Sequence, residues 1–136
     1  MKVRFPYDPQ MTTSIKGHKF EITRPFKILV GAIQVIIPMG FWTDLASTGI
    51  FSPLNKTMYP AILHDWLYYK QMLGGYPLER KQADVIFLRA METTEVNYFK
   101  RKMYYYGVRV GGWKPWNKYK NDRLKKNVEI HKQLIK

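Results

Sequence analysis

The spacing of apolar residues changes once along this chain, and that change is the strongest constraint on its fold. Between residues 18 and 42, short runs rich in β-branched and aromatic residues are separated by Pro25, Gly31 and a turn at 38–40. From residue 57 onward, apolar residues recur every three or four positions, as in helices that bury one side. A β-rich part followed by a helical part predicts an α+β fold.

The β-rich part contains three runs, HKFEIT, PFKILV and AIQVII. In the last run Ile33, Val35 and Ile37 alternate with their neighbours, as in a strand that buries mainly one face. We therefore expect a small N-terminal antiparallel β-meander over residues 18–42. Residues 1–17 are polar and contain Pro6 and Pro9, which predicts an extended arm or loop.

The helical part predicts a three-helix core over residues 57–110, with helices at about 57–72, 78–93 and 95–110. Thr57 is the expected N-cap of the first helix. We expect the aromatic residues of the third helix to pack in the core and at its rim. The second helix carries its apolar stripe at Ala83, Ile86, Phe87, Ala90 and Met91, and the third places Val96, Phe99, Met103, Tyr106 and Val110 on one face.

Composition bounds the number of domains, the compartment and the kind of partner that we expect for this chain. All 136 residues are expected to form one domain, and the absence of cysteine excludes disulfides and thiolate metal sites. No apolar run approaches the roughly 20 residues of a membrane span, and no signal peptide is recognisable, so synthesis and folding in the cytoplasm are expected. The net charge of +13 predicts an anionic partner.

The positive charge is concentrated at the C-terminal end. Residues 100–136 contain twelve Lys or Arg against two acidic residues, which accounts for +10 of the net charge of +13. Residues 111–136 thus form a basic, aromatic C-terminal arm or helix, suited to nucleic acid or to anionic lipid. The alternative is an arm laid across the domain with solvated lysines. The candidate surface residues are Trp113, Lys114, Trp116, Lys118, Lys120, Lys125 and Lys126.

The run ILHDWLYY places His64 and Asp65 in the most apolar part of the chain. Burying such groups costs several kcal/mol unless they are paired or coordinated. Asp84, on the next helix, is positioned to accept the Nδ1 proton of His64 and leave the other ring nitrogen available as a base. The alternative is a buried polar network that serves packing alone.

The pattern HDWLYY followed by ADVIFLRAM resembles the catalytic helix pair of secreted, bacterial and parvoviral phospholipases A2. This resemblance implies that His64 is a general base and that Asp65 is a calcium-binding carboxylate. It also implies that Tyr68 and Asp84 orient the histidine. Such enzymes use calcium to polarise the ester carbonyl and to bind the oxyanion.

The resemblance also raises the question of further metal ligands. Phospholipases A2 take most of these from a glycine-rich loop, where this chain has GFWTDLASTGIFSP instead. Asp44 would donate a ligand in place of that loop, giving a site for a divalent metal, calcium first and zinc or manganese next. The alternative is that Asp44 caps a turn or a short helix.

A wider resemblance extends from about residue 20 to 116. The motifs PMGFWTDLAS, YPAILHDWLYY, RKQADVIFLRAM and MYYYGVRVGGW, in this order, are similar to the phage and prophage family called domain of unknown function 1353 (DUF1353). The resemblance implies a tailed-phage or prophage origin. Three functions remain open: a virion-associated structural or accessory protein of the tail, neck or capsid interior that contacts other virion proteins, a metal-dependent hydrolase, or a non-specific nucleic-acid-binding protein.

Overall fold

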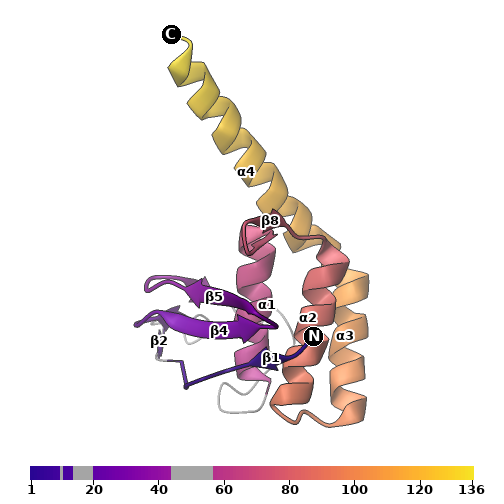
Figure 1. Ribbon diagram of the computed structural model, residues 1–136. Coiled ribbons are helices and arrows are strands. Elements are labelled where there is room, and N and C mark those ends of the chain that lie inside the picture. Colours follow the sequence, from indigo (N-terminus) through magenta and orange to yellow (C-terminus); the bar gives the residue numbers. More distant parts are fainter. Residues whose placement is uncertain (10, 14–19, 44–56) are drawn as a thin grey trace.

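The computed structural model describes residues 1–9, 11–13, 20–43 and 57–136. Antiparallel strands come first and helices follow, which confirms the predicted α+β fold. The helices are α1 (Met58–Lys70), α2 (Arg80–Thr93), α3 (Tyr98–Gly111) and α4 (Trp113–Leu134). In Figure 1, α2 lies between α1 and α3, the strands lie beside α1, and α4 projects away from the other elements.

Two small antiparallel sheets replace the single predicted meander. One contains β1 (Val3–Arg4), β4 (Phe26–Val30) and β5 (Ile33–Ile37), and the other β2 (Met11–Thr13), β3 (Phe20–Ile22) and β6 (Trp42–Thr43). Consecutive strands β3 and β4 therefore belong to different sheets. The link between them contains Pro25, whose fixed negative φ does not suit the tight turns that join hairpin strands.

The first residues of the chain are part of the fold, so the prediction of an arm over 1–17 is wrong for them. Val3 pairs with Val30 across β1 and β4 and is fully buried. Phe5 stacks on Phe26 at 6.2 Å between ring centroids. Val3 and Phe5 alternate with charged and proline neighbours, a strand pattern that is too short to recognise among polar residues.

A two-residue turn reverses the chain between α1 and α2. The short strands β7 (Met72–Leu73) and β8 (Tyr76–Pro77) form a hairpin around Gly74 and Gly75, which have φ of +58° and +84°. Positive φ at both central residues is the geometry of a tight hairpin turn, and glycine adopts it without steric cost. The hairpin brings α2 back against α1, so the buried side chains of both helices form the core together with the β1–β4–β5 sheet.

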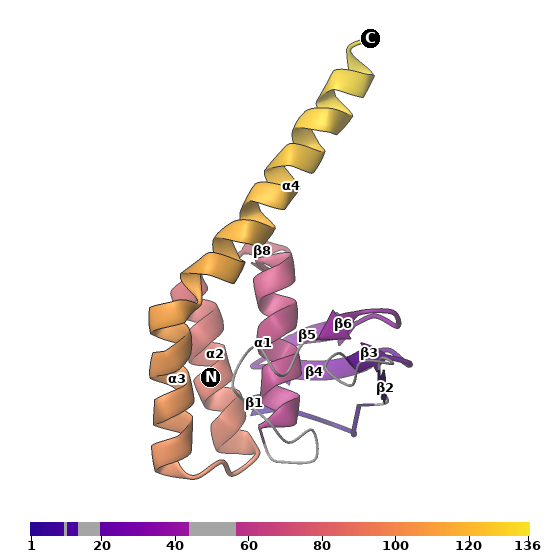
Figure 2. The ribbon, with the colours of Figure 1, turned by 180° about the vertical axis from the view of Figure 1, so that it is seen from behind.

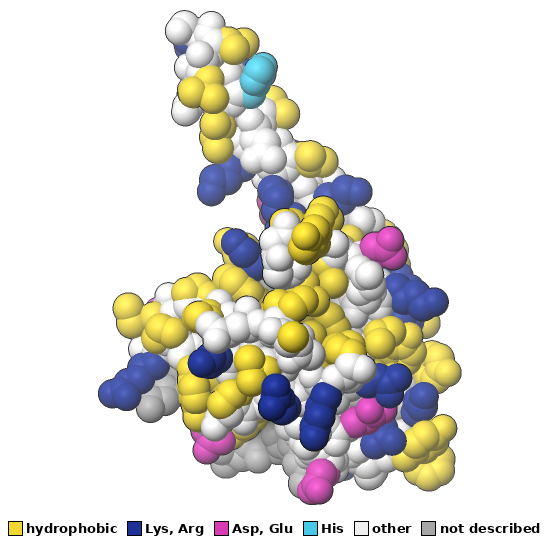
Figure 3. Space-filling view, viewed as in Figure 1, with side chains coloured by type: hydrophobic (Ala, Val, Ile, Leu, Met, Phe, Trp, Pro, Cys, Tyr) yellow, Lys and Arg dark blue, Asp and Glu magenta, His cyan; other side chains and the backbone are white. Residues whose placement is uncertain are grey.

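Helix α3 lies against α2 but exposes the side that we expected to pack. Phe99 and Val110 are 83% and 77% exposed, and Met103 and Tyr106 are exposed between them. These four residues form the α3 stripe, at the right-hand edge of Figure 3. No residue of α3 is fully buried. The half-buried side chains, which include Tyr104, Tyr105 and Val108, lie on the other side of the helix.

Helix α4 is held at its base by the end of α1. Trp116 packs edge-on against Tyr68 at 5.1 Å between ring centroids. Gln71, buried just beyond α1, donates to the Trp116 carbonyl at 2.8 Å and accepts from Arg123 at 3.0 Å. Beyond these contacts residues 124–136 are all exposed, and the helix extends away from the domain (Figure 2). None of the described helices combines the length and apolar character that crossing a membrane requires.

The α3–α4 junction predicts a strong difference between two adjacent glycines. A Cβ atom on Gly112 would overlap the Tyr68 hydroxyl and the Val108 carbonyl, whereas a Cβ on Gly111 would meet nothing within 4 Å. We expect Gly112→Ala to lower the free energy of unfolding by about 1–3 kcal/mol through overpacking. Gly111→Ala should change it by less than about 1 kcal/mol. Urea titrations of both variants measure the difference, and equal effects would contradict this account of the junction.

Candidate functional site

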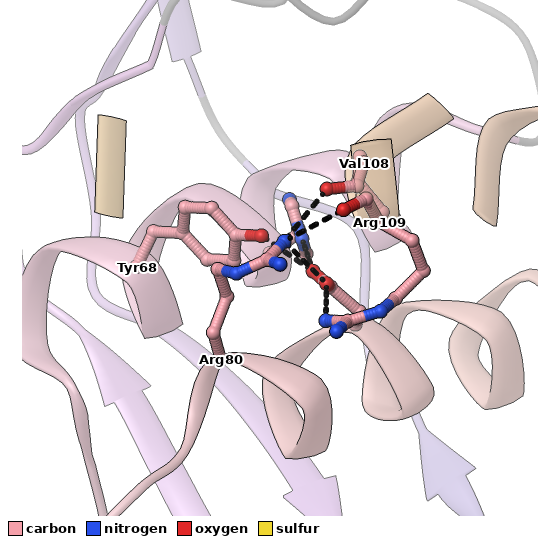
Figure 4. A network of polar contacts seen from close by, with 6 residues as sticks. Tyr68, Arg80, Val108 and Arg109 are labelled. Carbon is pink, nitrogen blue, oxygen red and sulfur yellow. Dashed lines mark hydrogen bonds and ion pairs between the residues drawn. The ribbon is translucent and has the colours of Figure 1, made fainter. Parts of the chain in front are cut away.

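A fully buried carboxylate, Asp84 of α2, is the centre of the main polar network. Its Oδ1 lies 2.8 Å from Nε2 of His64 and accepts a 2.6 Å hydrogen bond from the Tyr68 hydroxyl. Its Oδ2 accepts from Arg109 at 2.6 Å and from Arg80 at 3.4 Å. Figure 4 shows the two arginines reaching this cluster from opposite sides. We call Asp84 and these four donors the Asp84 network.

Helical spacing explains most of this geometry. His64 and Tyr68 lie one turn apart on α1, so both face α2, and Arg80 lies one turn before Asp84 on α2. Arg80 also donates to the carbonyls of Val108 and Arg109 at 3.0 and 3.2 Å. These carbonyls are in the last turn of α3 (Figure 4), and the Val108 carbonyl also accepts from the backbone N–H of Gly112 at 2.8 Å. The Asp84 network therefore joins α1, α2 and α3.

The electrostatics of the network keep its carboxyl group ionised. Burial by itself raises the pKa of Asp84, but the hydrogen bonds from His64 and Tyr68, with the charge of His64 and the bond from Arg109, hold the pKa below its ordinary value. Burial, followed by the hydrogen bond to Asp84, raises the pKa of the Tyr68 hydroxyl well above its ordinary value. Tyr68 thus remains a donor and Asp84 remains an acceptor at neutral pH.

The histidine meets the carboxylate through the nitrogen opposite to the one we expected. Because an ionised carboxylate can only accept, Nε2 of His64 carries the proton toward Asp84, and the expected Nδ1 contact is wrong. None of the residues that the structure describes hydrogen-bonds Nδ1. The ring lies between Tyr68 and Phe87, at centroid distances of 4.2 and 4.6 Å, and the residue is only 3% exposed.

Asp65, the predicted metal ligand, points away from this network. Its Oδ2 accepts a short hydrogen bond from the buried Thr43 of β6, which ties α1 to the second sheet. Asp44 lies outside the described residues. Within the described ranges, no group of three or more His, Asp or Glu side chains is arranged to hold a metal ion. The metal site of Asp44 and Asp65, with calcium, zinc or manganese, therefore stays a prediction.

The sequence profile of one family, described as "Protein of unknown function (DUF1353)", matches residues 20–108. The chain belongs to the DUF1353 family. No curated protein and no solved structure matches it. In this DUF1353 protein the matched region contains His64, Tyr68 and Asp84 and ends before α4.

The DUF1353 domain brings together the residues predicted on the two helices but adds three that the sequence reasoning missed. His64, Tyr68 and Asp84 meet as expected, whereas Arg80, Arg109 and Thr43 were not singled out. Arg80 had a recognisable signal, because it lies four residues before Asp84 on the same helix. Arg109 and Thr43 had none, because their contacts cross between elements that are distant in sequence.

The predicted surface of the C-terminal arm lies on α4, with one exception. Trp113 is 51% exposed and the Lys114 ammonium lies 5.6 Å from the centre of its ring. Trp116 instead turns inward onto Tyr68, so its ring is a packing contact. The remaining lysines of the predicted surface are all exposed, namely Lys118, Lys120, Lys125 and Lys126.

Removing the charge of Asp84 should destabilise the protein far more than removing an exposed charge. Asp84→Asn leaves the guanidinium groups of Arg80 and Arg109 without their anion, and breaking such a buried pair costs about 3–5 kcal/mol of unfolding free energy. Glu92→Gln is the matched control, because its pair with Arg89 at 3.1 Å is exposed and should contribute at most about 1 kcal/mol. Chemical denaturation at neutral pH measures both.

A comparison of the wild-type protein with Asp84→Asn at different pH values tests the ionisation of Asp84. Since its pKa is lower in the folded protein than in the unfolded chain, its stabilisation is fully present above the ordinary aspartate pKa of about 3.9 and is lost as pH falls through the folded value. The difference in unfolding free energy between wild type and Asp84→Asn should therefore shrink only in acid. A difference that stays constant into strong acid would refute the proposed ionised state.

Proposed function

We propose that this DUF1353 protein is a virion-associated structural or accessory component of a tailed phage or prophage, and that it works by binding rather than by catalysis. The observation that carries the proposal is a contrast between interior and surface. Both oxygens of the buried Asp84 carboxylate are paired within the Asp84 network, while the α3 stripe and residues 124–136 of α4 expose apolar and cationic side chains.

The interior supports a scaffold role for the network. Asp84 is fully buried and receives donors from three helices, and two of these donors are arginines. A carboxylate shared among several donors fixes the relative positions of the helices, because each donor must keep its place. The phage or prophage origin rests on the family resemblance, and the position in the tail, neck or capsid interior stays open.

Mass spectrometry of purified virions tests the virion assignment. We expect the protein in gradient-purified particles of the phage or induced prophage that encodes it, at a copy number that stays constant through repeated purification. An abundant host cytoplasmic protein, which should fall away with each step, is the control. If the protein disappears together with that control, it is not a virion component and the proposal fails.

A second candidate, a metal-dependent hydrolase of the phospholipase A2 type, is favoured by one specific observation. Asp84, which also accepts from Tyr68, holds His64 through Nε2, so Nδ1 is the acceptor whenever the ring is neutral. An imidazole held in this way is arranged to take a proton from water, as the resemblance of the helix pair implies. Asp65 would then hold the metal, although its described partner is Thr43.

The two candidates differ in what happens to a phospholipid substrate. A hydrolase should release fatty acid from phosphatidylglycerol vesicles in the presence of calcium, and His64→Gln, whose amide can still donate to Asp84, should abolish the release. Glu92→Gln, which changes an exposed side chain of α2 outside the Asp84 network, is the control and should keep full activity. No release by the wild-type protein with calcium, zinc or manganese would exclude this candidate.

A further inference from the structure

The end of α4 carries an apolar side that is exposed over residues 124–136. At about 100° per residue, five exposed apolar side chains of residues 124–136 fall within one side of the helix, with Asn127 and His131 between them. We call these five the α4 arc: Leu124, Val128, Ile130, Leu134 and Ile135. Exposed apolar surface of this extent marks an interaction site.

The charges around the α4 arc are ordered. Lys125 and Lys132 lie along one edge of it and Lys126 lies along the other. The two acidic residues of the helix, Asp122 and Glu129, lie on the opposite side of the helix. A helix that lies in a bilayer surface has this arrangement, because cations beside the apolar side reach anionic headgroups and acids opposite it face water.

We infer that the α4 arc binds the surface of an anionic lipid bilayer, with the helix lying along the headgroup region. This deepens the binding role proposed above and rests on it. A second copy of the chain is a poorer occupant, since each copy carries a net charge of +13 and two α4 helices would repel each other. Nucleic acid would neutralise the lysines but leave the apolar side chains in water.

The base of α4 supports the same inference. Gln71, Arg123 and Trp116 fix the first turns of the helix on α1, so the α4 arc is presented on a preformed rod. A preformed helix does not need to be ordered on binding, which lowers the free energy cost of association. Trp113 adds an exposed indole near the base, the side chain most favoured at membrane interfaces.

Vesicle co-sedimentation of the full-length protein tests this surface. The protein should bind vesicles of equal parts phosphatidylglycerol and phosphatidylcholine, and bind vesicles of phosphatidylcholine alone much more weakly. Leu124→Gln with Val128→Gln should weaken binding by about tenfold for each apolar side chain removed from the bilayer. Both residues are exposed and lie outside the apolar core, so circular dichroism and the urea midpoint should not change.

A matched double variant on α3 tests whether vesicle binding depends on the α4 arc or on any exposed apolar side chains. Met103→Gln with Val110→Gln removes two apolar side chains from the α3 stripe that are at least as exposed as Leu124 and Val128, and should leave vesicle binding unchanged. No binding by the wild-type protein, or equal weakening by both pairs of substitutions, would overturn the assignment of a bilayer to the α4 arc. The assignment would also be overturned if the protein formed dimers without lipid and the Leu124 and Val128 substitutions abolished them. A second copy of the chain would then be the occupant of the α4 arc.

The vesicle and virion experiments test separate claims, so either claim can fail while the other holds. A protein that is present in virions but does not bind vesicles keeps the proposed binding role and loses only the lipid partner. A protein that binds vesicles through the α4 arc but is absent from virions keeps the surface and loses the virion assignment.

Discussion

A single buried carboxylate determines how the helices of this protein are arranged. Asp84 is completely removed from water, and an ionised group in that position is tolerated only when several donors compensate it. The donors come from α1, α2 and α3, and the distances of 2.6 to 2.8 Å to His64, Tyr68 and Arg109 allow little displacement of any helix. The carboxylate thus adds positional specificity to a core that is otherwise held together by apolar contacts.

Sequence reasoning located Asp84 because the pattern that predicts its burial lies within a single helix. The apolar stripe of α2 predicts which side of the helix is buried, and Asp84 lies at the edge of that stripe. His64 was located because a titratable residue in the most apolar run needs a partner, and Tyr68 through the resemblance of the helix pair to phospholipases A2. The short glycine link predicts that the two helices face each other. Arg109 could not be found in this way, because only the tertiary packing of α3 brings it to Asp84. The choice between the two ring nitrogens of His64 also depends on that packing.

The third helix shows that apolar periodicity does not reveal what covers the apolar side of a helix. Phe99, Met103, Tyr106 and Val110 have the spacing of a buried stripe, yet they are exposed while the opposite side of α3 lies on α2. Periodicity indicates that one side of a helix is apolar, but it does not say whether this chain or another molecule covers that side. The same limit applied to the strands, where β3 and β4 were recognisable but their separation into two sheets was not.

The buried network and the exposed helix meet at the last turn of α1. Tyr68 donates to Asp84, packs against Trp116 and approaches Gly112 closely, so one side chain contacts both the network and the base of α4. Three residues later Gln71 adopts a left-handed φ of 54° and holds Trp116 and Arg123. Such a conformation is costly for a residue other than glycine and persists where surrounding contacts fix it. Since these contacts join α4 to α1, the direction of the projecting helix depends on the buried network. A substitution deep in the α1–α2 core can therefore change the lipid binding proposed for α4 without touching the α4 arc.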